Sequence, residues 1–314
     1  DMTYHKYNKK GRPDIDELVS QSCFNKSVLP QFKKGERWIL ADDEERISIQ
    51  SFENNCKKRY GIFDELSDFN RIGDVCDIGN GMVSGLDKAF QIDDPSSLND
   101  YEKQLLISVY KAKDLDQYVN TSMSYYLFIK QQFSEDSFRA LCPNLYSHLL
   151  LFSDKLKNRY SYGKDLKIWE FAFPRNEALF RRQEKRIFIP CKERISCKDY
   201  FRFAIADKNI FPLQDVTGIL KKKTCKEDVE YILAYLNNYR VFEWLKNNGI
   251  VKGEIVEFSE APIASIPYRP INWDNDFEVS IHQTIVGSVN DYLRTRDKKY
   301  LSIINSNFNS IFYE

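Results

Sequence analysis

The chain has 314 residues, of which 42% are hydrophobic and 29% are charged, as is ordinary for a globular protein with a sizeable core. Its 46 Lys and Arg balance its 46 Asp and Glu, so the net charge gives no argument for a nucleic-acid partner. Affinity for DNA would have to come from basic residues gathered on one face. No apolar run approaches the length of a membrane span, which predicts a soluble protein.

The cysteines and histidines give no metal-binding pattern. Seven cysteines are scattered without a Cys-x-x-Cys pair, and the closest two, Cys191 and Cys197, are six positions apart. This odd count, with no signal peptide in the sequence, predicts reduced thiols and a cytoplasmic location. His5, His148 and His282 lie far from Cys191 and Cys197 in the sequence, so we expect no metal.

The first two thirds of the chain predict mostly strands. Residues 1–37 are polar and are predicted to be a linker or the tail of a preceding domain, with a frayed terminus as the alternative. Residues 42–58 predict a helix, acidic at its start and basic at its end, that stops at Gly61. Further predicted elements are strands over Tyr125–Ile129, Ile168–Phe173, Arg186–Ile189, Tyr200–Ile205 and Val216–Leu220, and a helix over Asn144–Lys157.

From residue 224 the pattern becomes helical. Thr224–Glu227 is a capping-box sequence that predicts the start of a long helix ending at Gly249. A strand over Ile255–Phe258 and helices over Asp276–Arg296 and Lys298–Ser306 follow. The prediction is an α+β fold, with a strand-rich body over residues 38–223 and a helical C-terminal region over residues 224–314.

The chain is organised around Ile72–Asp93, which predicts two short strands joined by a loop with three glycines, Gly79, Gly81 and Gly85. Such a loop can expose backbone N–H groups, and Ser84 and Lys88 could offer a hydroxyl and a cation to phosphate. A cofactor cradle, a structural hairpin and a polyanion-facing loop are the three interpretations. A P-loop is excluded, and the dinucleotide fingerprint is one residue shorter and needs a following helix.

The same stretch, IGDVCDIGNGMVSGLDKAFQID, resembles the opening of the target-recognition domain of adenine-N6 DNA methyltransferases of the TaqI type, and more loosely the type I specificity subunits. Leu105–Leu115, Trp169–Arg175, Ala234–Asn238 and Ile263–Pro267 fit the same family in order, so the resemblance spans roughly Trp38 to Tyr268. It implies a duplex DNA partner and an upstream methyltransferase domain, in cis or in trans, that binds S-adenosylmethionine.

The catalytic chemistry of that family is not visible in this sequence. An adenine-N6 methyltransferase needs an Asx-Pro-Pro-aromatic loop for the extruded base, and the chain has no Pro-Pro dipeptide. No second Gly-rich turn is left for the cofactor, so we expect no cofactor and no catalytic residue in this chain. Glu-x-Lys, a nuclease signature, is absent, and Asp165–Lys167 and Asp297–Lys299 match Asp-x-Lys as chance allows.

Phosphates call for Lys, Arg and hydroxyls, while base edges call for bidentate side chains such as Arg. Arg175 follows a predicted strand and a proline, as a rigid base-reading residue would, and an ion pair with Glu170 or Glu177 is its alternative. The remaining DNA-binding candidates are Lys111 and Lys113, the basic cluster Lys192, Arg194 and Lys198, and, more weakly, Lys252; ordinary solvated cations are the alternative for them.

The sequence therefore predicts a DNA target-recognition domain that positions duplex DNA for a catalytic domain encoded upstream. The alternative is a specificity-subunit-like assembly module whose C-terminal helices bind partner subunits.

Overall fold

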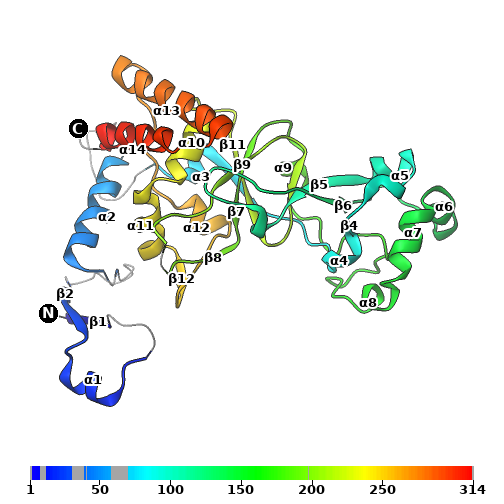
Figure 1. Ribbon diagram of the computed structural model, residues 1–314, viewed down its shortest axis with the longest axis horizontal. Helices are drawn as coiled ribbons and strands as arrows, with labels where there is room; N and C mark the ends of the chain where they lie inside the picture. The colour runs from blue at the N-terminus through cyan, green and yellow to red at the C-terminus, as the bar shows by residue number, and fades with distance from the viewer. Residues whose placement is uncertain are drawn as a thin grey trace.

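The computed structural model describes residues 2–7, 12–29, 39, 41–57, 70–196 and 198–312. The molecule is elongated, with a helical body at one end and a smaller lobe around α5 to α8 at the other (Figure 1). The predicted α+β class, with helices at the C-terminal end, is confirmed. The predicted boundary at Trp38 and the helix stop at Gly61 lie outside the described residues.

The N-terminal segment forms a small unit of its own, next to α2 in Figure 1. Strands β1 (Met2–Tyr7) and β2 (Phe24–Leu29) pair antiparallel, and α1 (Ile15–Ser20) lies between them in sequence. Asp14 and Glu17 form a capping box at the start of α1. This paired unit is more regular than the linker or tail that the polar sequence predicts for residues 1–37.

The central sheet is antiparallel, in the order β3-β11-β7-β9. Its strands are β3 (Cys76–Asn80), β11 (Val216–Lys221), β7 (Arg186–Pro190) and β9 (Ala204–Ala206). The predicted strands over 186–189 and 216–220 are confirmed, because both are apolar runs buried on two faces. The predicted strand over 200–205 is shorter, since regular pairing begins only at Ala204.

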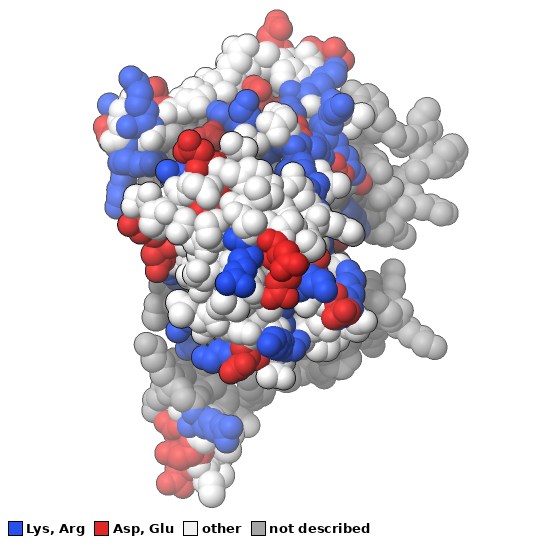
Figure 2. Space-filling view, turned by 90° about the vertical axis from the view of Figure 1, so that its right-hand side faces the viewer, with Lys and Arg blue, Asp and Glu red and all other residues white. Residues whose placement is uncertain are grey.

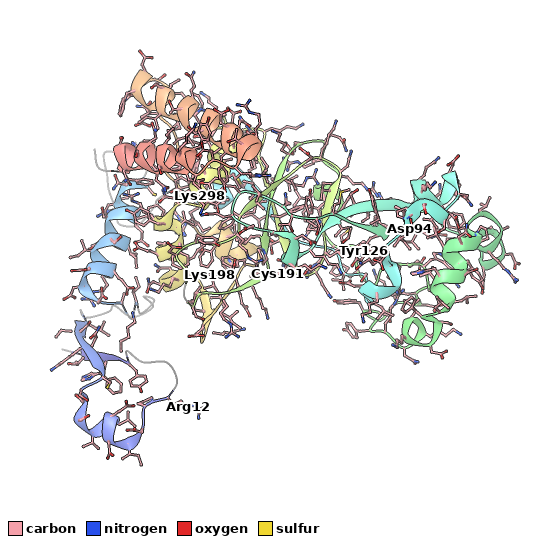
Figure 3. All side chains as sticks on the ribbon, in the orientation of Figure 1. Arg12, Asp94, Tyr126, Cys191, Lys198 and Lys298 are labelled. Carbon is pink, nitrogen blue, oxygen red and sulfur yellow. The ribbon has the colours of Figure 1, made fainter. Side chains whose placement is uncertain are left out.

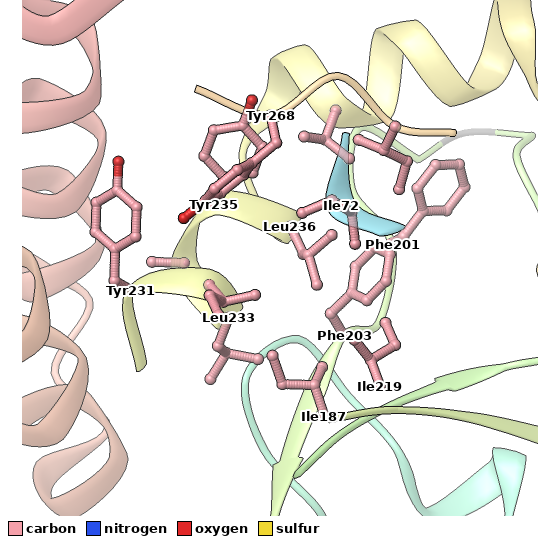
Figure 4. Close-up of a cluster of buried hydrophobic side chains, with 14 of the residues drawn as sticks. Ile72, Ile187, Phe201, Phe203, Ile219, Tyr231, Leu233, Tyr235, Leu236 and Tyr268 are labelled. Carbon is pink, nitrogen blue, oxygen red and sulfur yellow. The ribbon is translucent and has the colours of Figure 1, made fainter. Parts of the chain in front are cut away.

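Helices cover one face of this sheet. Leu233 and Leu236 of α10 lie on the side of the core that faces Ile187 and Ile219 of the sheet (Figure 4). The helices of this body are α2 (Asp43–Asn55), α3 (Ile72–Val75), α10 (Val229–Leu236), α11 (Tyr239–Asn248), α12 (Glu260–Ala264), α13 (Asp276–Thr295) and α14 (Lys299–Phe312). The apolar faces of α13 and α14 are buried in the same core.

The predicted helix over residues 224–249 is wrong in two respects. It begins only after Asp228, so the Thr224–Glu227 sequence does not cap it. It is also two helices, because Asn237 donates its side-chain amide to Phe203 O at 2.8 Å while Asn238 accepts from the Arg240 amide at 3.0 Å. These side-chain hydrogen bonds stabilise the interruption between the two helices. The second helix ends at Gly249, as predicted.

The lobe is built on a second sheet in the order β10-β5-β6-β4. Its strands are β10 (Ile210–Pro212), β5 (Leu106–Tyr110), β6 (Ser124–Leu127) and β4 (Gln91–Ile92). Its helices are α4 (Asp87–Phe90), α5 (Asp100–Gln104), α6 (Glu135–Leu141), α7 (Pro143–Leu150), α8 (Ser153–Lys157) and α9 (Glu177–Phe180), with 3-10 turns η1 (Pro95–Ser97) and η2 (Ala112–Asp114). The predicted helix over 144–157 is therefore split into α7 and α8.

A third sheet of three short antiparallel strands lies at the edge of the body, in the order β12-β13-β8. Its strands are β12 (Ile250–Lys252), β13 (Ile255–Glu257) and β8 (Lys192–Arg194). The predicted strand over 255–258 is confirmed as β13.

Two strand predictions near the glycine loop are wrong. Ile72–Asp93 is not a hairpin: β3 pairs with β11 in the central sheet, whereas β4 pairs with β6 in the lobe. Most of its second run is the helical turn α4. Ile168–Phe173 forms only one bridge, between Phe173 and Val83. The glycine stretch thus connects the two larger sheets.

Candidate nucleic-acid interface

The first part of the glycine loop, Gly81 to Ser84, is buried, and three of its amides are bonded within the fold. The amides of Gly81, Met82 and Val83 donate to Val216 O, Pro212 O and Phe173 O at 2.9, 3.0 and 2.9 Å. A Cβ at Gly81 would lie 2.0 Å from Leu213 O, so only glycine allows this close approach. The expectation of exposed N–H groups is corrected, because neighbouring carbonyls take these donors.

Ser84 and Lys88, predicted together as phosphate ligands, have different surroundings. Ser84 is fully buried, and its hydroxyl donates to Asp87 Oδ1 at 2.5 Å, so phosphate cannot reach it. Lys88 is exposed and lines a cavity of about 560 Å³ that also contains Asp93, Asp94 and His148. Lys88 stays a candidate, and Ser84 does not.

Lys111 and Lys113 also differ. The Lys111 ammonium lies 3.2 Å from Gln91 Oε1, 3.8 Å from Asp87 Oδ2 and 5.1 Å from the centre of the Tyr126 ring. Its side chain is only 17% exposed, so these contacts fix it inside the lobe. Lys113, on η2, is exposed.

Arg175 is half-buried and anchored at one end. Its Nε donates to Gly81 O at 2.7 Å, and among the described residues its two terminal nitrogens form no hydrogen bond. The alternative of an ion pair with Glu170 or Glu177 is not seen there. Glu177 instead pairs with Lys130 and Arg181 at 2.6 and 2.5 Å. The guanidinium of Arg175 is therefore anchored to the glycine loop through Nε, and its two terminal nitrogens are available for a ligand.

Within the predicted basic cluster, Lys192 and Arg194 are exposed, whereas Lys198 is partly buried. Lys192 and Lys252 both approach Glu257, at 3.4 and 3.0 Å, and Arg194 lies 3.8 Å from Glu254. These three cations, with side chains 66–71% exposed, share two carboxylates on the small β12-β13-β8 sheet. Exposed pairs of this kind contribute little stability, so phosphate could compete for the cations.

Lys198 belongs to a structural pair. It lies 2.7 Å from Glu193, whose side chain is 1% exposed and is also 2.6 Å from Arg202. A buried carboxylate needs such partners, so Lys198 is engaged within the fold.

The predicted cations are not gathered at one point. Figure 3 shows Lys198 in the helical body, Tyr126, which lies under Lys111, in the lobe, and Cys191 between them. On the end of the lobe, seen in Figure 2, Lys and Arg are interspersed with Asp and Glu over a largely uncharged face. A DNA interface on this chain would therefore be built from separate contacts.

The predicted DNA-binding residues leave out a segment that comprises the end of α8 and the loop after it. Residues 155–167 hold five Lys or Arg and one Asp, with Tyr160 and Tyr162 among them. Tyr160 is 75% exposed and Tyr162 44%, and Phe173, at 38%, lies beside them. The alternation of cations and tyrosines is a nucleic-acid signal that the sequence already contained.

The histidines and buried cysteines of the described residues have structural surroundings. No group of three His, Cys, Asp or Glu among them could bind a metal ion. His148 packs its Nε2 3.1 Å from Ala89 O, and His282 Nε2 accepts the Asp228 amide at 3.2 Å. Burial raises the pKa of the Cys56 and Cys225 thiols to about 12, so neither is a thiolate nucleophile.

No model of a known family matches the chain. By structure it is similar to the type IIL restriction-modification enzyme MmeI, with a TM-score of 0.52 and 11% identity over 82% of this chain and 35% of that one. That likeness defines the fold alone. Among the described residues no helix is both long and apolar enough to span a membrane.

By sequence the chain is 44% and 39% identical to the type II methyltransferases M.HindII and M.HincII of Haemophilus influenzae, over 90% of its own length and 55% and 54% of theirs. It is 33% identical to M.MjaIV of Methanocaldococcus jannaschii over 63% of its own length and 67% of that protein's. The chain belongs to the type II methyltransferase family of restriction-modification systems. It spans about half the length of the two Haemophilus relatives.

Proposed function

We propose that this chain is the part of a type II adenine-N6 DNA methyltransferase that recognises duplex DNA and holds it for a catalytic domain in the rest of the protein. The observation that carries the proposal is the β12-β13-β8 sheet, where Lys192, Arg194 and Lys252 are exposed and outnumber their two carboxylate partners. Loosely paired cations are what counterion release from DNA requires.

Two further observations support this assignment. The adenine-N6 chemistry rests on the resemblance of Ile72–Asp93 and the later stretches to TaqI-type recognition domains. MmeI, which shares the fold, was solved in complex with DNA. In this chain the resembling stretch joins the two larger sheets, so it would fix the relative positions of side chains on both.

Arg175 is our candidate for reading a base. Its Nε contact with Gly81 O fixes the guanidinium, and its terminal nitrogens have no hydrogen bond to the described part of the chain. A planar guanidinium matches the two major-groove acceptors of guanine, a contact that discriminates by about 1–3 kcal/mol.

S-adenosylmethionine does not fit the glycine loop of this chain. The amides of Gly81, Met82 and Val83 already donate to backbone carbonyls, and Leu213 O fills the space beside Gly81. We therefore assign the cofactor, and the methyl transfer that it supplies, to the catalytic domain outside this chain. The contribution of this chain would be to bind, orient and select DNA.

Titration of the 314-residue chain into fluorescein-labelled duplex DNA at 50–200 mM salt tests the proposal. We expect binding whose logarithmic affinity falls linearly with the logarithm of salt concentration. Absence of DNA binding, together with capture of a methyltransferase subunit, would favour the assembly-module alternative. The burial of the inner faces of α13 and α14 within the chain already leaves less apolar surface for that role.

A further inference from the structure

The loop after α8 presents aromatic rings to solvent. Tyr160 and Tyr162 have ring centres 4.6 Å apart, and Tyr162 and Phe173 have ring centres 5.2 Å apart. All three side chains are more than a third exposed. Exposed rings in contact with one another form a continuous aromatic surface. Contiguous apolar surface in contact with water often marks a binding site.

The loop is built to hold this surface in place. Arg159 donates to the backbone oxygens of Lys167 and Glu170, and at 3.4 Å to that of Ser84. The Phe173 amide and carbonyl both bond to Val83, at 2.9 Å each. The aromatic surface is thereby attached to the same buried glycine loop that anchors Arg175.

The tip of the loop is a tight turn in a conformation that tyrosine rarely adopts. Lys164 N donates to Ser161 O at 3.1 Å, and the two residues between them, Tyr162 and Gly163, have φ values of 55° and 74°. A bulky residue with positive φ costs energy, and such residues concentrate at functional sites. Asn would relieve this strain, so the tyrosine ring is the feature to explain.

The charge around the rings indicates the ligand. Residues 155–167 carry five cations and one carboxylate, and the Lys164 ammonium lies 5.9 Å from the centre of the Phe173 ring. Aromatic faces among cations suit nucleobases attached to phosphates, because every base has a π-face and the backbone is anionic.

We propose that Tyr160, Tyr162 and Phe173 stack against nucleobases exposed where the DNA duplex is opened. The inference rests on the proposed function, since it assumes that this chain binds duplex DNA. It adds a contact to unstacked bases, distinct from the phosphate contacts of the β12-β13-β8 sheet and from the base-edge contact of Arg175.

The test compares a matched duplex with the same duplex carrying a one-base bulge, using the 314-residue chain. We expect the chain to prefer the bulged probe, and Tyr160→Ala with Tyr162→Asn to weaken binding of that probe about 5- to 100-fold. Binding of the matched duplex and its salt slope should stay nearly unchanged. Asn at position 162 keeps the turn, because Asn tolerates positive φ.

Tyr125→Ala is the control for removing an exposed tyrosine, because Tyr125 is 37% exposed, near the 44% of Tyr162, but lies on β6 outside this loop. A 2-aminopurine at the bulge gives a direct reading: stacking on tyrosine should quench its fluorescence, and the double variant should restore it. Equal binding of both probes by wild type and double variant would overturn the stacking proposal while leaving duplex binding intact. Failure to bind either probe would overturn the proposed function and the inference together.

Discussion

At the scale of single residues, the two glycines Gly81 and Gly287 give opposite expectations for the same substitution. Gly81→Ala places a methyl group 2.0 Å from Leu213 O, which is backbone and cannot rotate away. We expect a loss of about 1–3 kcal/mol in the free energy of unfolding, as for overpacked cores. Gly287→Ala in α13 meets nothing within 4 Å and should add up to about 1 kcal/mol.

Urea denaturation of the two variants beside wild type measures both effects. A Gly81→Ala protein as stable as wild type would show that the loop can move away from Leu213, and that the junction between the sheets is less fixed than its contacts indicate.

Single residues also show what a sequence can and cannot predict about a site. The residue types suited to DNA were found, and Lys192, Arg194 and Lys252 are indeed exposed. The prediction for Ser84 is wrong, because Ser84 is fully buried, with its hydroxyl bonded to Asp87 and its carbonyl to Arg159 and Ala172. No local pattern distinguishes it from an exposed serine, since its burial comes from segments about 75 or more residues away in the sequence.

At the scale of elements, the β12-β13-β8 sheet yields a prediction about ionic strength. Replacing Lys192, Arg194 and Lys252 together by Gln removes three exposed cations whose partners are weak. We expect DNA affinity to fall for all sequences and the salt slope to flatten by up to about 0.9 for each cation that no longer neutralises a phosphate. Anisotropy titrations at several salt concentrations measure this slope.

Lys198→Gln is the control for that triple variant. It removes a cation from the same part of the chain, but one paired with the buried Glu193. It should lower the free energy of unfolding by about 1–3 kcal/mol and leave the salt slope unchanged. A flattened slope for Lys198→Gln, or an unchanged one for the triple variant, would contradict the division between exposed and structural cations.

A second element-scale prediction concerns the start of α10 and pH. His282 accepts the amide of Asp228, the N-cap of α10, through Nε2, and this bond needs the neutral imidazole. Burial lowers the pKa of His282, although Asp228 and Glu227 oppose the shift. The unfolded chain therefore binds this proton more readily, so the stability is present above about pH 6.5 and is lost as the pH falls below it.

Denaturation at pH 7.5 and pH 5.5 checks this sign. The free energy of unfolding should fall toward pH 5.5 in wild type and fall less in His282→Gln, which has no titratable group there. An equal fall in both proteins would assign the pH dependence to other residues.

The elements that were predicted correctly are those whose own residues determine the structure without a distant partner. Strands β7 and β11 are apolar on both faces, and α13 carries its apolar residues at helical spacing. The failures have tertiary causes. Ile168–Phe173 is apolar enough for a strand, but among the described residues it forms a single β-bridge, between Phe173 and Val83. The run after the glycines forms α4 and then β4, which belongs to another sheet. Pairing partners distant in sequence decided these cases.

At the scale of the whole molecule, we expect this chain to bind DNA without binding S-adenosylmethionine. The chain spans 55% of M.HindII, its sequence has no Pro-Pro dipeptide, and the amides of Gly81, Met82 and Val83 in its glycine loop are already bonded. We therefore expect calorimetric titration of S-adenosylmethionine into the chain to show no binding at micromolar concentrations. The same sample should release or absorb heat when titrated with duplex DNA, which controls for folded, active protein. A micromolar dissociation constant for the cofactor would place a methyl-donor site on this chain and contradict its role as a recognition part alone.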